Sequence, residues 1–164
     1  MTEVVYPGTF DPVHYGHLDI VQRAARIFDK IYVAVAESSS KKPLFSLKER
    51  VELFQTAVKD LGLQHKVEVL GFSTLLVDLL KDLGINTVIR GVRLFTDFEY
   101  ELQISLTNYR LAKVETLFMM PSQDLIHISS TIVKDIARHG GCLKTLVPPN
   151  VEKALKEKFQ KVNY

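Results

Sequence analysis

The chain has 164 residues, of which 46% are hydrophobic and 24% are charged. This balance is typical of a globular protein, and the length suits one compact domain, so we expect a single domain over residues 1–164. The 21 Lys and Arg residues nearly cancel the 19 Asp and Glu residues, which gives no electrostatic reason to expect a nucleic-acid or membrane partner. Anion recognition must therefore depend on local charge.

Five short apolar segments are predicted to be buried strands. Each is rich in β-branched residues and is followed by a turn or a polar segment. In chain order the predicted strands are Val4–Tyr6, Ile31–Ala36, Val67–Leu70, Thr87–Ile89 and Leu117–Met120.

Helical patterns lie between and after these strands. Ser46 and Glu49 form an S-x-x-E capping box, Gly84 is placed to end a helix, and Pro148 and Pro149 separate the last helix from the preceding segment. The predicted helices are, in chain order, a helix from His17 with Leu18, Val21, Ala25 and Phe28 on one face, the helix Leu47–Asp60, a helix with Leu76, Leu79, Leu80 and Leu83 on one face, a helix beginning near Asp97, and the helices Ile132–Arg138 and Val151–Lys161.

The alternation of strands and helices predicts a Rossmann-like, doubly wound α/β fold. We expect a five-stranded, mainly parallel sheet with helices on both faces. In such a fold ligands bind in a crevice at the carboxyl ends of the strands. Motifs that directly follow a strand are therefore the first candidates for a functional site.

Cysteine content and hydropathy exclude further classes of protein. Cys142 is the only cysteine, so no intrachain disulfide can form. The longest apolar stretch, residues 75–83, is broken by three charged residues and is too short to span a bilayer. No basic and apolar signal region precedes the strand-like segment at residues 4–7, and we expect a cytoplasmic protein.

The loop after the first predicted strand, Gly8–His17, reads GTFDPVHYGH. Gly8 permits close backbone approach to a ligand, and the start of a helix attracts phosphate. His14 and His17 are three residues apart, so two imidazole donors facing one anion, a capping or packing role, and zinc binding are alternative interpretations. No matching Cys or Glu-x-x-His set accompanies them, and no Gly-rich phosphate fingerprint occurs here, which weakens the zinc and P-loop interpretations.

Five ordered motifs resemble those of a known family. YPGTFDPVHYGH at residues 6–17 is similar to the T/H-x-G-H loop of the nucleotidyltransferase superfamily, and specifically of the phosphopantetheine adenylyltransferases. In that family His14 is often Thr and Thr131 is often Ser, and both replacements keep a hydrogen-bonding group. The other four motifs follow in the family's order and spacing and extend the resemblance over essentially the whole chain: SKKP at 40–43, RGVR at 90–93, DFEYE at 97–101 and ISST at 128–131.

The resemblance implies a reaction and its partners. The expected reaction is reversible transfer of the adenylyl group of ATP to 4′-phosphopantetheine, which gives dephospho-CoA and pyrophosphate in coenzyme A biosynthesis. It also implies Mg²⁺ held mainly by substrate phosphates and water, so that no protein metal ligand is expected. A homohexamer and feedback binding of CoA are expected by the same resemblance, with no nucleic-acid or membrane partner.

The expected chemistry requires cations and N–H donors because a phosphate monoester is already largely dianionic near neutral pH and needs no strong general base. The resemblance implies that His17 stabilises the transition state and that Lys41 and Arg93 are catalytic. It places Thr9, Lys41, Leu76 and Arg90 at the acceptor. It places at ATP the residues Thr9, Phe10, His17, Gly91, Val92, Arg93, Glu101, Leu125, Ile126, His127, Ile128, Ser129, Ser130 and Thr131.

Several of these residues also have plainer interpretations. A lysine pair such as Lys41 and Lys42 is ordinarily part of a solvated loop, and only the family match assigns Lys41 to a substrate. Acids at a helix start complement the helix dipole, and only the match assigns Glu101 to the nucleotide, at the ribose. Ser129 can be an N-cap, but one hydroxyl suffices for a cap, so the run of three indicates a second phosphate site. Of the apolar residues Leu75, Leu76, Ile104 and Leu106, only Leu76 is assigned to the acceptor.

Other functions remain as alternatives. Another small nucleotidyltransferase, acting on nicotinate mononucleotide or an alcohol phosphate, is disfavoured by ISST and SKKP. A class I tRNA synthetase shares the H-x-G-H loop, but KMSKS is absent and the chain is too short for anticodon recognition. A nucleotide sensor without turnover is disfavoured because His17, Lys41, Arg93 and the hydroxyl run occur together.

Overall fold

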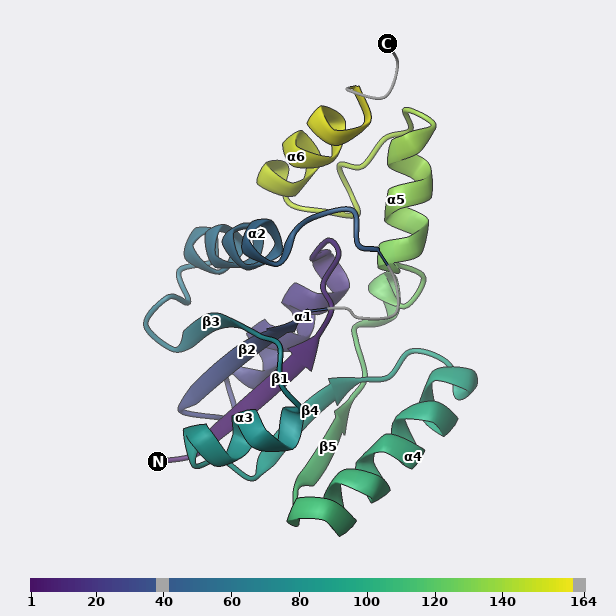
Figure 1. Cartoon of the computed structure of the whole chain (residues 1–164). Coiled ribbons are helices and arrows are strands. Elements are labelled where there is room, and N and C mark those ends of the chain that lie inside the picture. Colours follow the sequence, from purple (N-terminus) through teal and green to yellow (C-terminus); the bar gives the residue numbers. More distant parts are fainter. Residues whose placement is uncertain (38–41, 161–164) are drawn as a thin grey trace.

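The structure, a computed structural model, describes residues 1–37 and 42–160 (Figure 1). Two predictions lie outside the described residues: the site residue Lys41, and Lys161 at the predicted end of the last helix. Among the described helices, none has both the length and the apolar character that crossing a membrane requires.

Strands and helices alternate in the described chain as predicted. The strands are β1 (Glu3–Gly8), β2 (Lys30–Ala36), β3 (Val67–Phe72), β4 (Thr87–Gly91) and β5 (Glu115–Met119). A short 3₁₀ helix, η1 (Gln123–Leu125), was not predicted. The α-helices are α1 (Tyr15–Ala24), α2 (Leu47–Asp60), α3 (Leu76–Leu83), α4 (Phe95–Ala112), α5 (Ser130–Arg138) and α6 (Pro149–Gln160).

The five strands form one sheet in the order β3-β2-β1-β4-β5, and each adjacent pair is parallel. This confirms the Rossmann-like α/β prediction. The chain builds outward from β1 through β2 to β3 and then continues on the other side of β1 with β4 and β5. The switch point between β1 and β4 is where a parallel α/β sheet opens a crevice for ligands.

The strands β1 and β4 separate toward their carboxyl ends. Six residues of β1 are in register with β2, from Glu3 with Lys30 to Gly8 with Val35, whereas the registered pair with β4 is Val5 with Val88. Pro7, two residues beyond Val5, has no N–H to donate to a ladder. The sequence thus ends the β1–β4 pairing early and leaves room at this edge.

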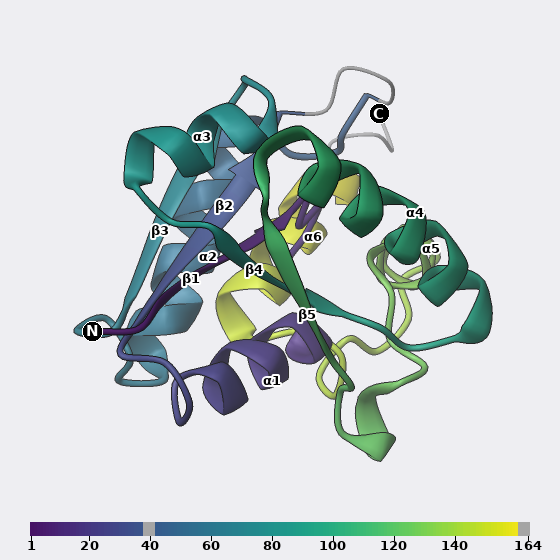
Figure 2. The same ribbon diagram turned by 90° about the horizontal axis from the view of Figure 1, so that it is seen from below.

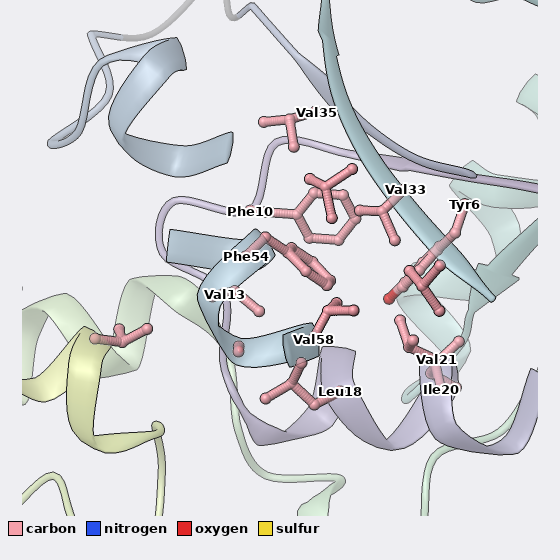
Figure 3. Packing of buried hydrophobic residues seen from close by; sticks show 14 of the residues in the cluster. Tyr6, Phe10, Val13, Leu18, Ile20, Val21, Val33, Val35, Phe54 and Val58 are labelled. Carbon is pink, nitrogen blue, oxygen red and sulfur yellow. The ribbon is translucent and has the colours of Figure 1, made fainter. Parts of the chain in front are cut away.

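Helices cover both faces of the sheet, as Figure 2 shows. Along β1, Val4 and Tyr6 face the cluster formed with α1, α2, α5 and α6, while Val5 faces the cluster formed with α3 and α4. Strand residues alternate between faces, so a run of apolar residues fits a sheet that is buried on both sides. In Figure 3 the rings of Phe10 and Phe54 lie together in the first cluster, close to Val33 and Val35.

Local sequence signals placed some helices correctly. Helix α2 spans the predicted Leu47–Asp60 and begins with the predicted capping box, in which Ser46 Oγ accepts from the Glu49 N–H and a Glu49 carboxylate oxygen accepts from the Ser46 N–H. Gly84 ends α3 with φ of 68°, a left-handed conformation that glycine adopts without strain.

Other boundaries differ from the predictions. Helix α1 begins at Tyr15 rather than His17 because His14 caps it, and it ends at Ala24, so Phe28 lies beyond the helix. Strand β5 begins two residues before Leu117, at the exposed Glu115, whose N–H donates to Asn86 O, and it ends before Met120. The remaining starts are also earlier than predicted: Phe95 for α4, Ser130 for α5, and Pro149 for α6, where proline fits the first helical turn.

A buried arginine joins three segments near the carboxyl edge of the sheet. Arg50 on α2 is 1% exposed. Its Nη1 donates to Thr9 O at 2.9 Å and to Ala36 O at 2.7 Å, and its Nε donates to Phe45 O at 3.1 Å. These carbonyls belong to the loop after β1, the end of β2 and the residue before the α2 cap. Burial lowers the pKa of Arg50, but a guanidinium stays charged at neutral pH.

We expect Arg50→Met to destabilise the protein by about 2–4 kcal/mol, because it leaves three carbonyls without their charged donor. Urea denaturation measures the loss. Ser46→Ala, which removes the cap of the same helix, is the control and should cost about 1 kcal/mol. An Arg50→Met loss no larger than the Ser46→Ala loss would contradict this role.

Candidate active site

A cavity of about 790 Å³ lies at the carboxyl ends of β1 and β4. In Figure 1 the arrow of β1 points toward the end of the molecule where α5 lies, and the start of α5 contributes to the cavity wall. Its lining includes residues of the loop after β1, α1, the end of β4, α4 and α5. The predicted site residues on this wall are Thr9, Phe10, His17, Arg90, Gly91, Arg93, Glu101, Leu125, Ser129, Ser130 and Thr131.

The loop after β1 is held by the Phe10 side chain. Phe10 has a positive φ of 49°, which is uncommon for a residue with a side chain. Its buried ring makes edge contacts with the rings of Tyr6, His17 and Phe54, with centroids 4.8–5.1 Å apart. A Cβ atom at Gly8 would lie 2.7 Å from the same ring, so Gly8 is required for Phe10 to fold back over the strand end.

The two histidines form the start of α1. His14 Nδ1 accepts from the Gly16 N–H at 3.0 Å, and His17 Nδ1 accepts from the His14 N–H at 3.1 Å, which together make a capping box. A ring nitrogen that accepts a hydrogen bond carries no proton, so each neutral ring carries its proton on Nε2. The rings stack with their centroids 3.6 Å apart.

Burial keeps both imidazoles neutral. It lowers the pKa of His14 to about 3, and burial together with the adjacent His14 lowers the pKa of His17 well below its usual value. Each ring therefore offers the cavity a neutral Nε2–H donor near pH 7. Of the interpretations left open by the sequence, capping is confirmed, and it is compatible with an anion at Nε2. Within the residues that the structure describes, no group of three or more His, Cys, Asp or Glu side chains is arranged to hold a metal ion.

Arg90 bridges the gap between β1 and β4. Its Nη1 donates to Pro7 O on β1, and its Nε and Nη2 donate to the two carboxylate oxygens of Glu101 at 2.7 and 2.5 Å. Burial acts to lower the pKa of Arg90, but the hydrogen bonds and charge of Glu101 raise it above its usual range. The bidentate pair fixes the plane of the guanidinium, so Arg90 presents a rigid positive charge to the cavity.

Arg93 and the start of α5 form the opposite part of the wall. Arg93 Nη1 donates to Ile128 O at 2.8 Å, and its Nε lies 3.4 Å from an Asp97 carboxylate oxygen. Ser129 Oγ caps α5 by accepting from the Ile132 N–H, as the plainer interpretation held. Ser130 Oγ donates to Pro12 O at 2.9 Å. The Ser129 hydroxyl thus caps α5, and the Ser130 hydroxyl connects the start of α5 to the loop after β1.

A smaller cavity of about 330 Å³ adjoins the larger one. The predicted acceptor residue Leu76 lines it together with Ile104, whereas Leu75 and Leu106 are exposed. Polar side chains at Ser105 and Asn108 complete an amphipathic wall. The two cavities share six lining residues, namely Pro7, Gly8, Thr9, Arg90, Tyr100 and Glu101.

Four predicted nucleotide residues do not line the larger cavity. The Val92 N–H donates to Met119 O at the end of β5, and Ile128 is buried and its carbonyl accepts from Arg93. Ile126 is half-buried and His127 is exposed. Their motif neighbours Gly91, Arg93, Leu125 and Ser129 line the cavity wall.

Sequence reasoning missed three charged side chains of the wall. Lys42, whose role was left open, lines the larger cavity, as do Asp11 and Lys134. Lys134 lies four residues after Ser130 and hence on the same face of α5, a spacing that could have identified it. Asp11 lies inside the quoted loop but gave no signal of its own, because its partners are distant in sequence.

Comparison with known proteins agrees with this geometry. The family model of cytidylyltransferase-like proteins matches residues 5–136. A phosphopantetheine adenylyltransferase of Aquifex aeolicus is 62% identical over 95% of this chain and 95% of its own length. One of Haemophilus influenzae is 54% identical over 95% of this chain and 99% of its own length. The chain belongs to the phosphopantetheine adenylyltransferase family.

Solved structures of other nucleotidyltransferases share the fold. A putative nicotinate-nucleotide adenylyltransferase of Vibrio parahaemolyticus superposes with a TM-score of 0.71 at 18% identity, covering 95% of this chain and 99% of its own. A bifunctional NMN adenylyltransferase/ADP ribose pyrophosphatase of Francisella tularensis gives 0.74 at 14% identity, covering 99% of this chain and 52% of its own. At these identities the likeness shows a shared fold and says nothing of the substrate.

The lowered pKa of His14 makes a testable contribution to stability. Between pH 6.5 and about 3 the unfolded chain binds a proton at His14 that the folded protein does not, so stability present above pH 6.5 is lost as the pH falls. We expect the unfolding free energy of the protein, relative to His14→Asn, to fall by about 1.4 kcal/mol per pH unit from pH 6.5 to 4.5. The difference should be constant from pH 7 to 9, and a constant difference over the acid range would contradict the lowered pKa.

Proposed function

We propose that the protein transfers the adenylyl group of ATP to 4′-phosphopantetheine and gives dephospho-CoA and pyrophosphate, as the names of its relatives suggest. The observation that carries the proposal is the pair of adjoining cavities, which share Thr9 and the Arg90–Glu101 pair. The larger, with its cations and imidazole donor, suits a nucleoside triphosphate. The smaller, with apolar and amide-binding groups, suits a pantetheine arm.

The acceptor phosphate would enter from the smaller cavity and meet ATP at the shared wall. An oxygen of the acceptor phosphate attacks the α-phosphorus of ATP in line, the bond to the bridging oxygen of the β-phosphate breaks, and pyrophosphate leaves with that electron pair. Arg90 holds the acceptor phosphate, and its pairing with Glu101 keeps the guanidinium in one orientation. The role of Thr9 at this junction is to donate to the same phosphate.

His17 would stabilise the charge that develops during transfer. Its Nδ1 is occupied by the His14 N–H, so Nε2–H is the donor available to an α-phosphate oxygen. The ring is fixed by stacking on His14 and by the edge contact with Phe10, so little reorganisation is needed when the transition state forms. Arg93 and the start of α5 suit the β- and γ-phosphates, because a helix start supplies N–H donors.

Mg²⁺ is proposed to arrive with ATP and to neutralise part of the triphosphate charge. Each carboxylate on the wall of the larger cavity is engaged by a cation: Asp11 by Lys134, Asp97 by Arg93 and Glu101 by Arg90. This arrangement favours a metal held by phosphates and water. Lys41, which lies outside the described residues, is proposed as a further substrate contact on the family match.

We also propose a cytoplasmic homohexamer, on family resemblance. The outer side of α4 carries large apolar side chains that a copy of the chain would cover, among them Phe98, Leu102, Leu106 and Tyr109. Burial of such a surface is a typical source of stability in permanent assemblies.

Pyrophosphate release tests the substrate assignment. The protein is incubated with ATP, Mg²⁺ and one of several acceptors: 4′-phosphopantetheine, nicotinate mononucleotide or glycerol phosphate. We expect release with phosphopantetheine alone, because the smaller cavity accepts a long, amphipathic arm. Release with another acceptor and none with phosphopantetheine would overturn the assignment.

The role of His17 is tested by His17→Ala, which removes the Nε2–H donor. We expect turnover to fall roughly 100-fold or more, with a much smaller change in ATP affinity. His139→Ala is the matched control, because this histidine is exposed at the end of α5, and it should keep full turnover. Near-normal turnover of His17→Ala would remove this residue from the mechanism.

A further inference from the structure

Asp11 is a buried carboxylate whose partners come from two distant segments. The residue is 4% exposed. Its Oδ2 accepts from the Leu44 N–H at 2.9 Å and its Oδ1 from the Phe45 N–H at 3.0 Å. Lys134 Nζ on α5 lies 3.1 Å from Oδ2. A loop residue thus holds a segment 33 and 34 residues later and a helix 123 residues later.

The two segments that Asp11 holds both carry a cation on the wall of the larger cavity. Lys42 and Pro43, which line that cavity, directly precede the residues bound by Asp11. The chain that follows Lys42 and Pro43 is also fixed, because Phe45 is buried and Ser46 caps α2. Lys134 lines the same cavity.

The buried Asp11 carboxylate has three donors, which is more than it needs to remain ionised in the folded protein. Two backbone N–H groups already stabilise an ionised carboxylate. The third donor, Lys134, has a side chain that is 27% exposed and borders the cavity. A lysine ammonium on a flexible stem turns to solvent unless it is held, so the carboxylate determines where this charge lies.

We propose that Asp11 is a positioning residue for adenylyl transfer, whose carboxylate holds the Lys42 segment and the Lys134 ammonium in place toward the triphosphate of ATP. The inference rests on the proposed function, because it assigns the larger cavity to ATP. Asp11 itself contacts no substrate in this scheme and acts through the two cations.

The principal variant is Asp11→Asn. An amide oxygen can accept one of the two N–H bonds, but the NH₂ group cannot accept the other and cannot pair with the ammonium. We expect kcat to fall about 10-fold or more and the Kd of MgATP, measured by calorimetry without acceptor, to rise several-fold, with a smaller rise in the KM of phosphopantetheine. A merely structural role would not separate the two substrates in this way.

Lys134→Met and the double variant test the route of the effect. Lys134→Met is expected to raise the Kd of MgATP several-fold even if Asp11→Asn does not fold. The losses in the double variant should be smaller than the product of the single losses, because both changes break one contact. Losses that multiply would overturn the coupling.

A second carboxylate and a second lysine provide the matched controls. Asp29 Oδ2 accepts from the Thr2 N–H at 2.7 Å, and Lys156 Nζ lies 3.0 Å from Glu152 Oε1; none of these residues lines the cavities. Asp29→Asn and Lys156→Met therefore remove the same kinds of contact elsewhere, and both should keep kcat and the Kd of MgATP within about 2-fold. Equal effects in the two pairs, or unchanged MgATP binding in Asp11→Asn and Lys134→Met, would overturn the proposal.

The wild-type protein separates this proposal from the proposed function. If it releases no pyrophosphate with phosphopantetheine yet binds MgATP, the acceptor assignment fails, and the calorimetric comparison still tests Asp11. If it releases pyrophosphate and the variants bind MgATP normally, the proposed function stands and the positioning role fails.

Discussion

A positive charge buried beside the carboxyl edge of the sheet is the constraint on which the site depends. Arg50 donates to the carbonyls of Thr9, Ala36 and Phe45, which lie on three separate segments beside this edge. Removing a guanidinium from water is unfavourable unless its donors are used, so the three segments are held at fixed distances from one another. The loop after β1 can then adopt the positive φ at Phe10 that brings its ring onto His17.

The larger cavity results from strands that stop pairing, and polar side chains replace the missing ladder. Pro7 has no N–H with which to continue the pairing of β1 with β4. The Pro7 carbonyl accepts a hydrogen bond from the Arg90 guanidinium in place of one from a backbone N–H of β4. Asp11 performs the equivalent task on the other side of β1, where its carboxylate accepts from Leu44 and Phe45. The edge that carries the candidate site is therefore built from charged groups that also bind backbone atoms of the protein.

Local signals made the fold and most of the cavity wall predictable. The S-x-x-E box fixed the start of α2, and apolar runs located all five strands to within two residues at each end. The family motifs located His17 near the start of α1, Arg90 and Arg93 at and just beyond the end of β4, and Ser130 at the start of α5. The start of α1 was wrong because an imidazole served as its cap, a role usually filled by Ser, Thr, Asp or Asn. Asp11 escaped notice because its contact with Lys134 spans 123 residues and has no local pattern. Lys134 itself was missed although its spacing from Ser130 places the two on one face of α5.

The Arg90–Glu101 pair is a wall common to both cavities, and this has a consequence for the release of product. In the proposed function, the two separate substrates would each occupy one side of the wall, whereas the product joins them and would span it. Each half of the product would then keep the other at a high effective concentration. Release of the joined product would therefore be slower than release of either substrate alone.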